Sequence, residues 1–265
     1  MMIVRYSLLK IEKVLYKNQT NRGNIIMKCF RSTSINTIEK VYTEGIVPSC
    51  GRNSRLIGDN RKKVFFSEEF HGTIALLIDF NIVYNKIKNN QMQLSDNELY
   101  SRVINSKNIR EYLGEGVYLT FDSEKVVNEN ENNEVDGFTS EKIKPDLLEV
   151  AMIENINDGT FSYSRFDVVH FMMAQIKPDD IKYSGIKWPN IELYEKHNKK
   201  SEEEKIRINQ SKIRQYYEEN QELINKFRTN QYILVYIPLN QFINEIYTSE
   251  EKTGTFQKEL IKRSI

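Results

Sequence analysis

The segment from 28 to 80 constrains the fold of this chain more than any other. A β-branched and aromatic run at 25–30 indicates a strand, which ends in Arg31 and a serine- and threonine-rich stretch. A second apolar run, Val64–Phe66, ends in Ser67 and precedes a helical pattern of apolar residues. Two strand ends with hydroxyl and charged groups in one short unit form a layout that can hold a phosphorylated ligand.

A short helix is predicted between these two strands. Ser34 is placed to cap its first turn, and Gly45 supplies the left-handed residue that ends it, before Pro48. The apolar positions repeat with the spacing of a single buried helical face, at Ile35, Ile38, Val41 and Tyr42.

The remainder of the chain predicts an α+β protein with a mixed, largely antiparallel sheet core and flanking helices. No linker separates two halves, so residues 1–265 are interpreted as a single domain. The polar stretch at about 122–145 is expected to be a mobile insertion, and 199–229 a helical extension formed by a long charged C-terminal helix. The other strands are expected at 117–121, 147–156, 166–176 and 232–237.

The composition excludes several classes of protein. With 38 basic and 37 acidic residues the net charge is +1, so no global field attracts nucleic acid or a membrane. Cys29 and Cys50 form no CxxC pair, which predicts neither a metal site nor a disulfide framework and favours a reducing compartment. No apolar run is long enough to cross a bilayer. We therefore expect a cytoplasmic protein, and export without a cleaved signal is compatible with the sequence.

The same unit resembles the start of the ADP-ribosyltransferase-like fold, which bacterial toxins, poly(ADP-ribose) polymerases and RNA 2′-phosphotransferases share. Cys29–Ser34 is similar to the first strand of that family, Glu44–Pro48 to its glycine-containing turn, and Val64–Ser67 to its second strand. A rival alignment places the second family strand at Gly116–Thr120, which resembles the Gly-x-Tyr-x-Ser/Thr pattern of the polymerase subgroup.

The resemblance implies that the protein binds NAD and transfers ADP-ribose to a macromolecular target, protein or RNA, or hydrolyses NAD. It implies catalytic roles for Arg31, Ser67 and Glu69. It leaves the family's later glutamate open among Glu69, Glu115, Glu149 and Glu154. The residues implied to contact NAD are Arg31, Ser32, Thr33, Phe66 and His71.

Plainer interpretations exist for the same residues. Arg31 is more often a surface charge at a strand end than a ligand, and Ser67 is more often the cap of the following helix. His170, between apolar neighbours, is expected to be a hydrogen-bonded core histidine. The alternative function is a non-catalytic bacterial or phage interaction protein that docks through the helix at 199–228. A third class, RNA binding through the basic loop at 52–63, rests on charge alone.

Overall fold

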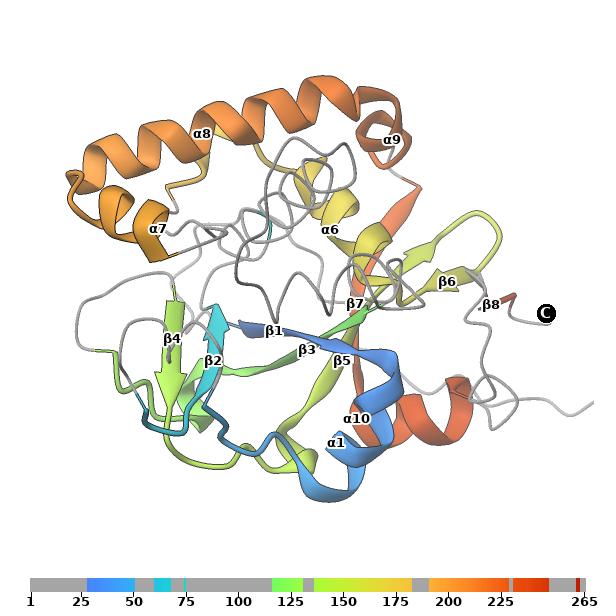
Figure 1. Ribbon diagram of the computed structural model, residues 1–265. Helices are drawn as coiled ribbons and strands as arrows, with labels where there is room; N and C mark the ends of the chain where they lie inside the picture. Colours follow the sequence, from blue (N-terminus) through green and yellow to red (C-terminus); the bar gives the residue numbers. More distant parts are fainter. Residues whose placement is uncertain are drawn as a thin grey trace, which may run out of the picture.

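The computed structural model describes residues 28–50, 60–67, 74, 116–130, 136–182, 191–228, 231–247 and 261–262. Every strand pair among them is antiparallel, and the strands form one sheet in the order β4-β2-β1-β3-β5-β6-β8, with β7 paired to β5 (Figure 1). The predicted α+β class is confirmed. The strands are β1 Lys28–Ser34, β2 Val64–Ser67, β3 Gly116–Asp122, β4 Asp136–Thr139, β5 Glu149–Asn155, β6 Thr160–Ser162, β7 Tyr232–Pro238 and β8 Ile261–Lys262.

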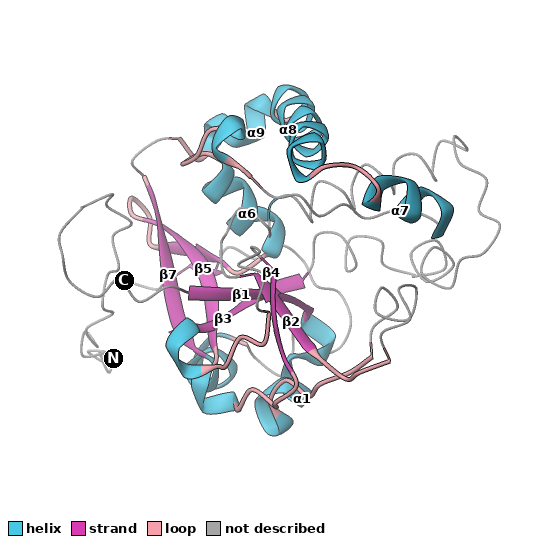
Figure 2. Cartoon of the chain, turned by 90° about the vertical axis from the view of Figure 1, so that its left-hand side faces the viewer, coloured by secondary structure: helices cyan, strands magenta, loops and turns pink. Residues whose placement is uncertain are grey.

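Helices cover both faces of this sheet. In Figure 1, α1 and α10 lie below the central strands, whereas α6, α8 and α9 lie above them, and Figure 2 shows the same for α1, α6, α8 and α9. None of the described helices is both long and apolar enough to cross a membrane. The helices are α1 Ile38–Glu44, α6 Arg165–Met173, α7 Ile191–Asn198, α8 Glu202–Glu219, α9 Gln221–Lys226 and α10 Leu239–Gln241, with short turns of other helical type at Ile35–Thr37, Ser123–Lys125, Pro145–Leu147, Pro178–Asp180 and Phe242–Ile246.

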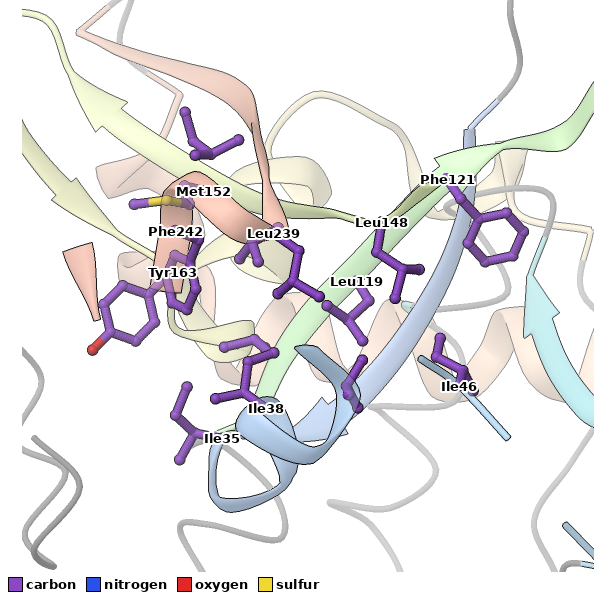
Figure 3. Close-up of a cluster of buried hydrophobic side chains, with 14 of the residues drawn as sticks. Ile35, Ile38, Ile46, Leu119, Phe121, Leu148, Met152, Tyr163, Leu239 and Phe242 are labelled. Carbon is purple, nitrogen blue, oxygen red and sulfur yellow. The ribbon is translucent and has the colours of Figure 1, made fainter. Parts of the chain in front are cut away.

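Strand alternation divides the core into two apolar clusters, one on each face of the sheet. Successive side chains of a strand point to opposite faces, so Cys29 and Phe30 enter different clusters. The lower cluster packs α1 and α10 against the sheet, as Figure 3 shows for Ile38, Leu119 and Phe242. The upper cluster packs α6, α8 and α9 against the opposite face.

The predicted helix after β1 is confirmed in its main features. Ser34 Oγ accepts a hydrogen bond from the Asn36 backbone N–H at 3.3 Å, in the short helical turn that precedes α1. Gly45 ends α1 with φ of 74°, and its N–H donates to the Val41 carbonyl. A Cβ atom at Gly45 would lie 2.2 Å from the Ile143 carbonyl oxygen, so glycine is required there for space as well as conformation.

The stretch over 122–145, predicted to be a mobile insertion, contains β4, which pairs with β2 in the sheet. The polar side chains of this stretch hold the backbone instead of leaving it solvated. Asn128 Oδ1 accepts from the backbone N–H groups of Asn130 and Phe138, at 2.9 and 3.2 Å. Glu129 Oε1 likewise accepts hydrogen bonds from the backbone N–H and the side-chain hydroxyl of Ser140. Composition alone did not reveal these side-chain to backbone bonds.

The strand predicted at 166–176 is a helix, α6, and this prediction was wrong. A continuous apolar run has the same appearance in a buried strand and in a helix that is buried on all sides. Here Val168, Val169 and Met173 are fully buried on α6 between the sheet and α8. The strand predicted at 147–156 is confirmed, because β5 covers most of that range.

The charged segment at 199–228 consists of α8 and α9, which meet at Asn220. Its apolar stripe does not face outward. Ile213, Tyr217 and Ile224 are buried in the upper cluster of the protein's own core. This part of the stripe is therefore covered within the chain, whereas Ile206 and Ile208 near the start of α8 are partly buried.

Candidate functional site

The two strands that compete for the second family position both lie next to β1. On one side β1 pairs with β2 through Phe30 and Ser67, and on the other side it pairs with β3 along its whole length. Residues paired across an antiparallel ladder point to the same face of a sheet. The registers therefore decide which of the predicted site residues share a face.

Arg31 and Ser67 leave the sheet on opposite faces. Ser67 pairs with Phe30, whereas Arg31 is the next residue along β1 and pairs with Leu119 of the lower cluster. The Arg31 Nη1 atom donates to the Phe65 carbonyl oxygen at 2.6 Å. Burial lowers the pKa of this guanidinium, which nevertheless remains protonated at neutral pH. The expectation that Arg31 and Ser67 line a common crevice is not met, because Arg31 is engaged with the backbone of β2.

Phe66, expected to pack on a nicotinamide ring, belongs to the lower apolar cluster. Its ring meets that of Phe121 edge-on, with centroids 5.3 Å apart. Its neighbour Phe65 is 42% exposed, and the centroid of its ring lies 6.0 Å from that of Phe138. Phe66 is therefore a core residue, and the accessible ring on β2 is that of Phe65.

The exposed end of β1 gathers a different set of residues on the upper face of the sheet, which we define as the β1-end site: Ser32, Gly116, Tyr118 and Arg165. Ser32 is exposed and pairs with Tyr118 of β3, so the two share the upper face of the sheet. Arg165, the first residue of α6, donates from Nη1 to the Ser32 Oγ at 2.5 Å. Thr33, which was expected to contact NAD, pairs with Val117 of the lower cluster and so points to the opposite face, where its hydroxyl hydrogen-bonds the hydroxyl of Thr37 at 2.9 Å.

Gly116 makes this arrangement sterically feasible. A Cβ atom on Gly116 would lie 2.6 Å from the Thr33 carbonyl oxygen and 3.3 Å from the Cζ and Nε atoms of Arg165. The first of these distances is far below van der Waals contact, and its partner is a backbone atom with little freedom to move. The absence of a side chain thus lets the guanidinium lie close to the strand pair.

The site holds one guanidinium, that of Arg165, next to the amino end of α6. Burial raises the pKa of the Tyr118 phenol above its ordinary value, and the neighbouring Arg165 guanidinium acts in the opposite direction. The amino end of α6 adds the positive end of a helix dipole at the same place. The acidic residue of its first turn, Asp167, accepts a hydrogen bond from Ser162 Oγ at 2.7 Å. An anionic oxygen could bind here, because it would accept hydrogen bonds from the Arg165 guanidinium and the Ser32 hydroxyl and lie near the amino end of α6.

Of the four candidate glutamates, Glu149 shares the face of Ser67. One row of paired residues crosses β2, β1, β3 and β5 as Ser67, Phe30, Thr120 and Glu149. Glu154 lies five residues further along β5 and points to the opposite face. Glu69 and Glu115, like His71, lie outside the described residues.

Glu149 belongs to a half-buried charge cluster. Its Oε2 atom lies 2.5 Å from Lys28 Nζ, which also contacts Asp122 at 2.6 Å, and Asp122 in turn contacts Lys125 at 2.6 Å. Burial acts to lower the pKa of Lys28, but the bonds to Asp122 and Glu149 prevail and raise it. Burial likewise opposes ionisation of Asp122, but Lys125 and Lys28 hold its pKa below the usual value. The cluster therefore pairs both carboxylates with lysine ammonium groups.

The other sequence candidates have simpler roles. His170 is fully buried and bonded through both ring nitrogens, which confirms the core histidine. In the basic loop, Arg52 and Arg55 lie outside the described residues, and Lys63 is buried with its ammonium group 3.7 Å from the Phe138 ring centroid. That lysine does not contribute to a nucleic-acid surface.

Sequence reasoning missed Arg165, because it assigned the following apolar run to a strand. One available signal was the serine at 164 with an acidic residue at 167, a pattern typical of helix starts. Comparisons with protein families, with curated proteins and with solved structures found no match to this chain.

Proposed function

We propose that this protein is an ADP-ribosyltransferase-like enzyme that binds NAD and holds its pyrophosphate at the β1-end site. The observation that carries the proposal is the bond from Arg165 to Ser32. It places a guanidinium on the exposed strand end whose sequence resembles the first strand of that family. In this proposal Arg165 takes the role that the sequence suggested for Arg31.

The chemistry of the site fits a pyrophosphate. A guanidinium presents five N–H donors in a planar fork, so it can hold a serine hydroxyl and a phosphate oxygen together. The Ser32 hydroxyl can donate to a second oxygen, and the amino end of α6 contributes a favourable field. A neutral ligand would gain none of the charge-assisted bonds, so the site favours an anion.

For the transfer step we assign the carboxylate to Glu149. The bond between C1′ of the ribose and the nicotinamide nitrogen breaks, nicotinamide leaves with the electron pair, and C1′ becomes oxocarbenium-like. An ionised carboxylate stabilises that positive charge until a target side chain or water attacks C1′ and gives up a proton. Among the described candidates, Glu149 is the one on the face of Ser67, and its carboxylate forms an ion pair with Lys28.

The test measures NAD binding by isothermal titration calorimetry for the wild type, Arg165→Ala and Arg31→Ala. Loss of a charge-assisted bond costs roughly 1.5–3 kcal/mol, so Arg165→Ala is expected to weaken binding about 10- to 100-fold. Arg31→Ala is expected to lower stability, with less effect on affinity. Absence of wild-type binding at millimolar NAD refutes the proposal. A loss of NAD affinity in Arg31→Ala but not in Arg165→Ala would assign the phosphate contact to Arg31 instead.

The catalytic assignment has a matched pair of variants on one strand. Glu149→Gln is expected to retain NAD binding and to lose nicotinamide release, whereas Glu154→Gln, on the opposite face of β5, keeps both. Equal activity of Glu149→Gln and the wild type excludes Glu149 as the carboxylate. The macromolecular target, protein or RNA, is then sought by transfer of labelled ADP-ribose from NAD.

A further inference from the structure

Two consecutive tyrosines of α8 bind α6, the helix that carries Arg165. Tyr216 Oη lies 3.0 Å from the Nε2 atom of His170, and Tyr217 Oη donates to the Met173 carbonyl at 2.8 Å. Both contacts lie inside the upper apolar cluster, where α6 packs between α8 and the sheet (Figures 1 and 2). The first contact is near the middle of α6 and the second is at its carboxyl end.

The hydrogen-bond pattern determines the tautomer of His170. Its Nδ1 atom lies 2.6 Å from the Phe166 carbonyl oxygen, which can only accept, so Nδ1 carries the proton. In the neutral ring Nε2 is then an acceptor, and the Tyr216 hydroxyl donates to it. Burial lowers the pKa of His170, while the Phe166 carbonyl and Asp167 act against that change. The ring is therefore neutral near pH 7.

This ring connects α8 to the first turn of α6. Phe166, which accepts from His170, directly follows Arg165 in the chain. Tyr118 of β3 lies in the same upper cluster as Tyr216, and it pairs with Ser32, which accepts the hydrogen bond from Arg165. Polar groups buried in an apolar layer are costly to displace, so such a network holds its members in one geometry.

We infer that Tyr216 and His170 are positioning residues that hold Arg165 in the geometry required for binding a phosphorylated ligand at the β1-end site. The inference rests on the proposed function for the identity of that ligand. It also implies a pH dependence, because a protonated His170 has two N–H donors and cannot accept from Tyr216. The charged and titratable groups around this contact are Arg165 and Asp167 on α6, Glu219 on α8 and Tyr118 on β3.

The test compares Tyr216→Phe with Tyr217→Phe, a matched control that removes the neighbouring hydroxyl from the same helix pair. NAD affinity is measured by calorimetry at about pH 7.5 and about pH 5.5. Tyr216→Phe is expected to weaken binding about 3- to 10-fold at the higher pH and to flatten the pH profile. Tyr217→Phe is expected to retain the wild-type affinity and profile. Equal behaviour of the two variants overturns the inference.

A second measurement does not depend on NAD. The NMR resonance of the Arg165 Nε–H group, assigned by its loss in Arg165→Lys, is followed during a pH titration of the unliganded protein. In the wild type it is expected to shift together with the His170 ring signals, and in Tyr216→Phe that common shift is expected to disappear. If the chemical shift of the Arg165 Nε–H group does not change while His170 titrates, the positioning role is refuted. Failure of NAD to bind the wild type, with this coupling present, refutes the proposed ligand alone.

Discussion

The Arg165 Nη1 atom donates a hydrogen bond to Ser32 Oγ across a sequence separation of 133 residues. The bond joins the start of α6 to the exposed end of β1, above the strand pair that β1 forms with β3. Gly116 lies directly beneath the guanidinium and leaves room for it. The geometry of the site therefore depends on three elements that are distant in sequence.

Gly116→Ala is expected to destabilise the protein by about 1–3 kcal/mol, the usual cost of overpacking a tight site. The new methyl group would lie 2.6 Å from the Thr33 carbonyl oxygen and would press on Arg165, so NAD affinity is expected to fall as well. Urea denaturation and calorimetry measure the two effects. A variant with wild-type stability and affinity would show that this close approach is unimportant.

Lys28→Met is expected to lower stability by about 1–3 kcal/mol, because Asp122 and Glu149 would lose a partner in a half-buried site. The control is Lys40→Met, which removes an exposed lysine 3.9 Å from Glu44. An exposed pair of that kind contributes less than about 0.5 kcal/mol. Chemical denaturation of both variants gives the comparison, and equal losses would contradict a special role for the Lys28 cluster.

The same cluster predicts two pH limits of stability. The folded pKa of Asp122 is depressed, so its contribution is complete above its unfolded pKa and is lost as pH falls through the folded value. The folded pKa of Lys28 is raised, so its contribution is complete below its unfolded pKa and is lost as pH rises through the folded value. Stability curves of the wild type and Lys28→Met should therefore converge at both extremes of pH. A constant difference throughout would argue against this linkage.

His170 predicts a further loss of stability in mild acid. Its folded pKa lies below the ordinary 6.5, so between the two values the unfolded chain binds more protons than the folded protein. Stability is thus expected to decrease as pH falls below 6.5, by at most about 1.4 kcal/mol per pH unit. His170→Gln should lose this slope in denaturation curves recorded across that range. Persistence of the slope in the variant would assign it to another group.

Ile38→Ala tests the lower cluster, where Ile38 is fully buried beneath the sheet (Figure 3). Removal of a buried aliphatic side chain is expected to cost about 2–5 kcal/mol. Val47→Ala, at a position 51% exposed, should change stability by less than about 0.5 kcal/mol. Thermal and urea unfolding provide both values, and a mild effect of Ile38→Ala would mean that the cluster relaxes around the gap.

Local patterns predicted local structure well where a single arrangement of the backbone satisfied them. The helix between Ser34 and Gly45 has a cap, an apolar stripe and a glycine terminator, and all three point to one conformation. The apolar run of α6 has a start signal at Ser164 and Asp167 but no glycine terminator, and its continuous burial removes the periodicity that separates helix from strand. The interpretation of this run as a strand left Arg165 out of the predicted site residues.

From its sequence alone, this chain determined its α+β class, most of its central strands and the hydroxyl-rich end of β1, since each follows from patterns within a few residues. Tertiary structure alone decided which guanidinium meets that strand end. Register sets the face to which every side chain of a strand points, and a shift of one residue exchanges the faces. That register separates Arg31 from Ser67, and the packing of α6 on the sheet brings Arg165 to Ser32.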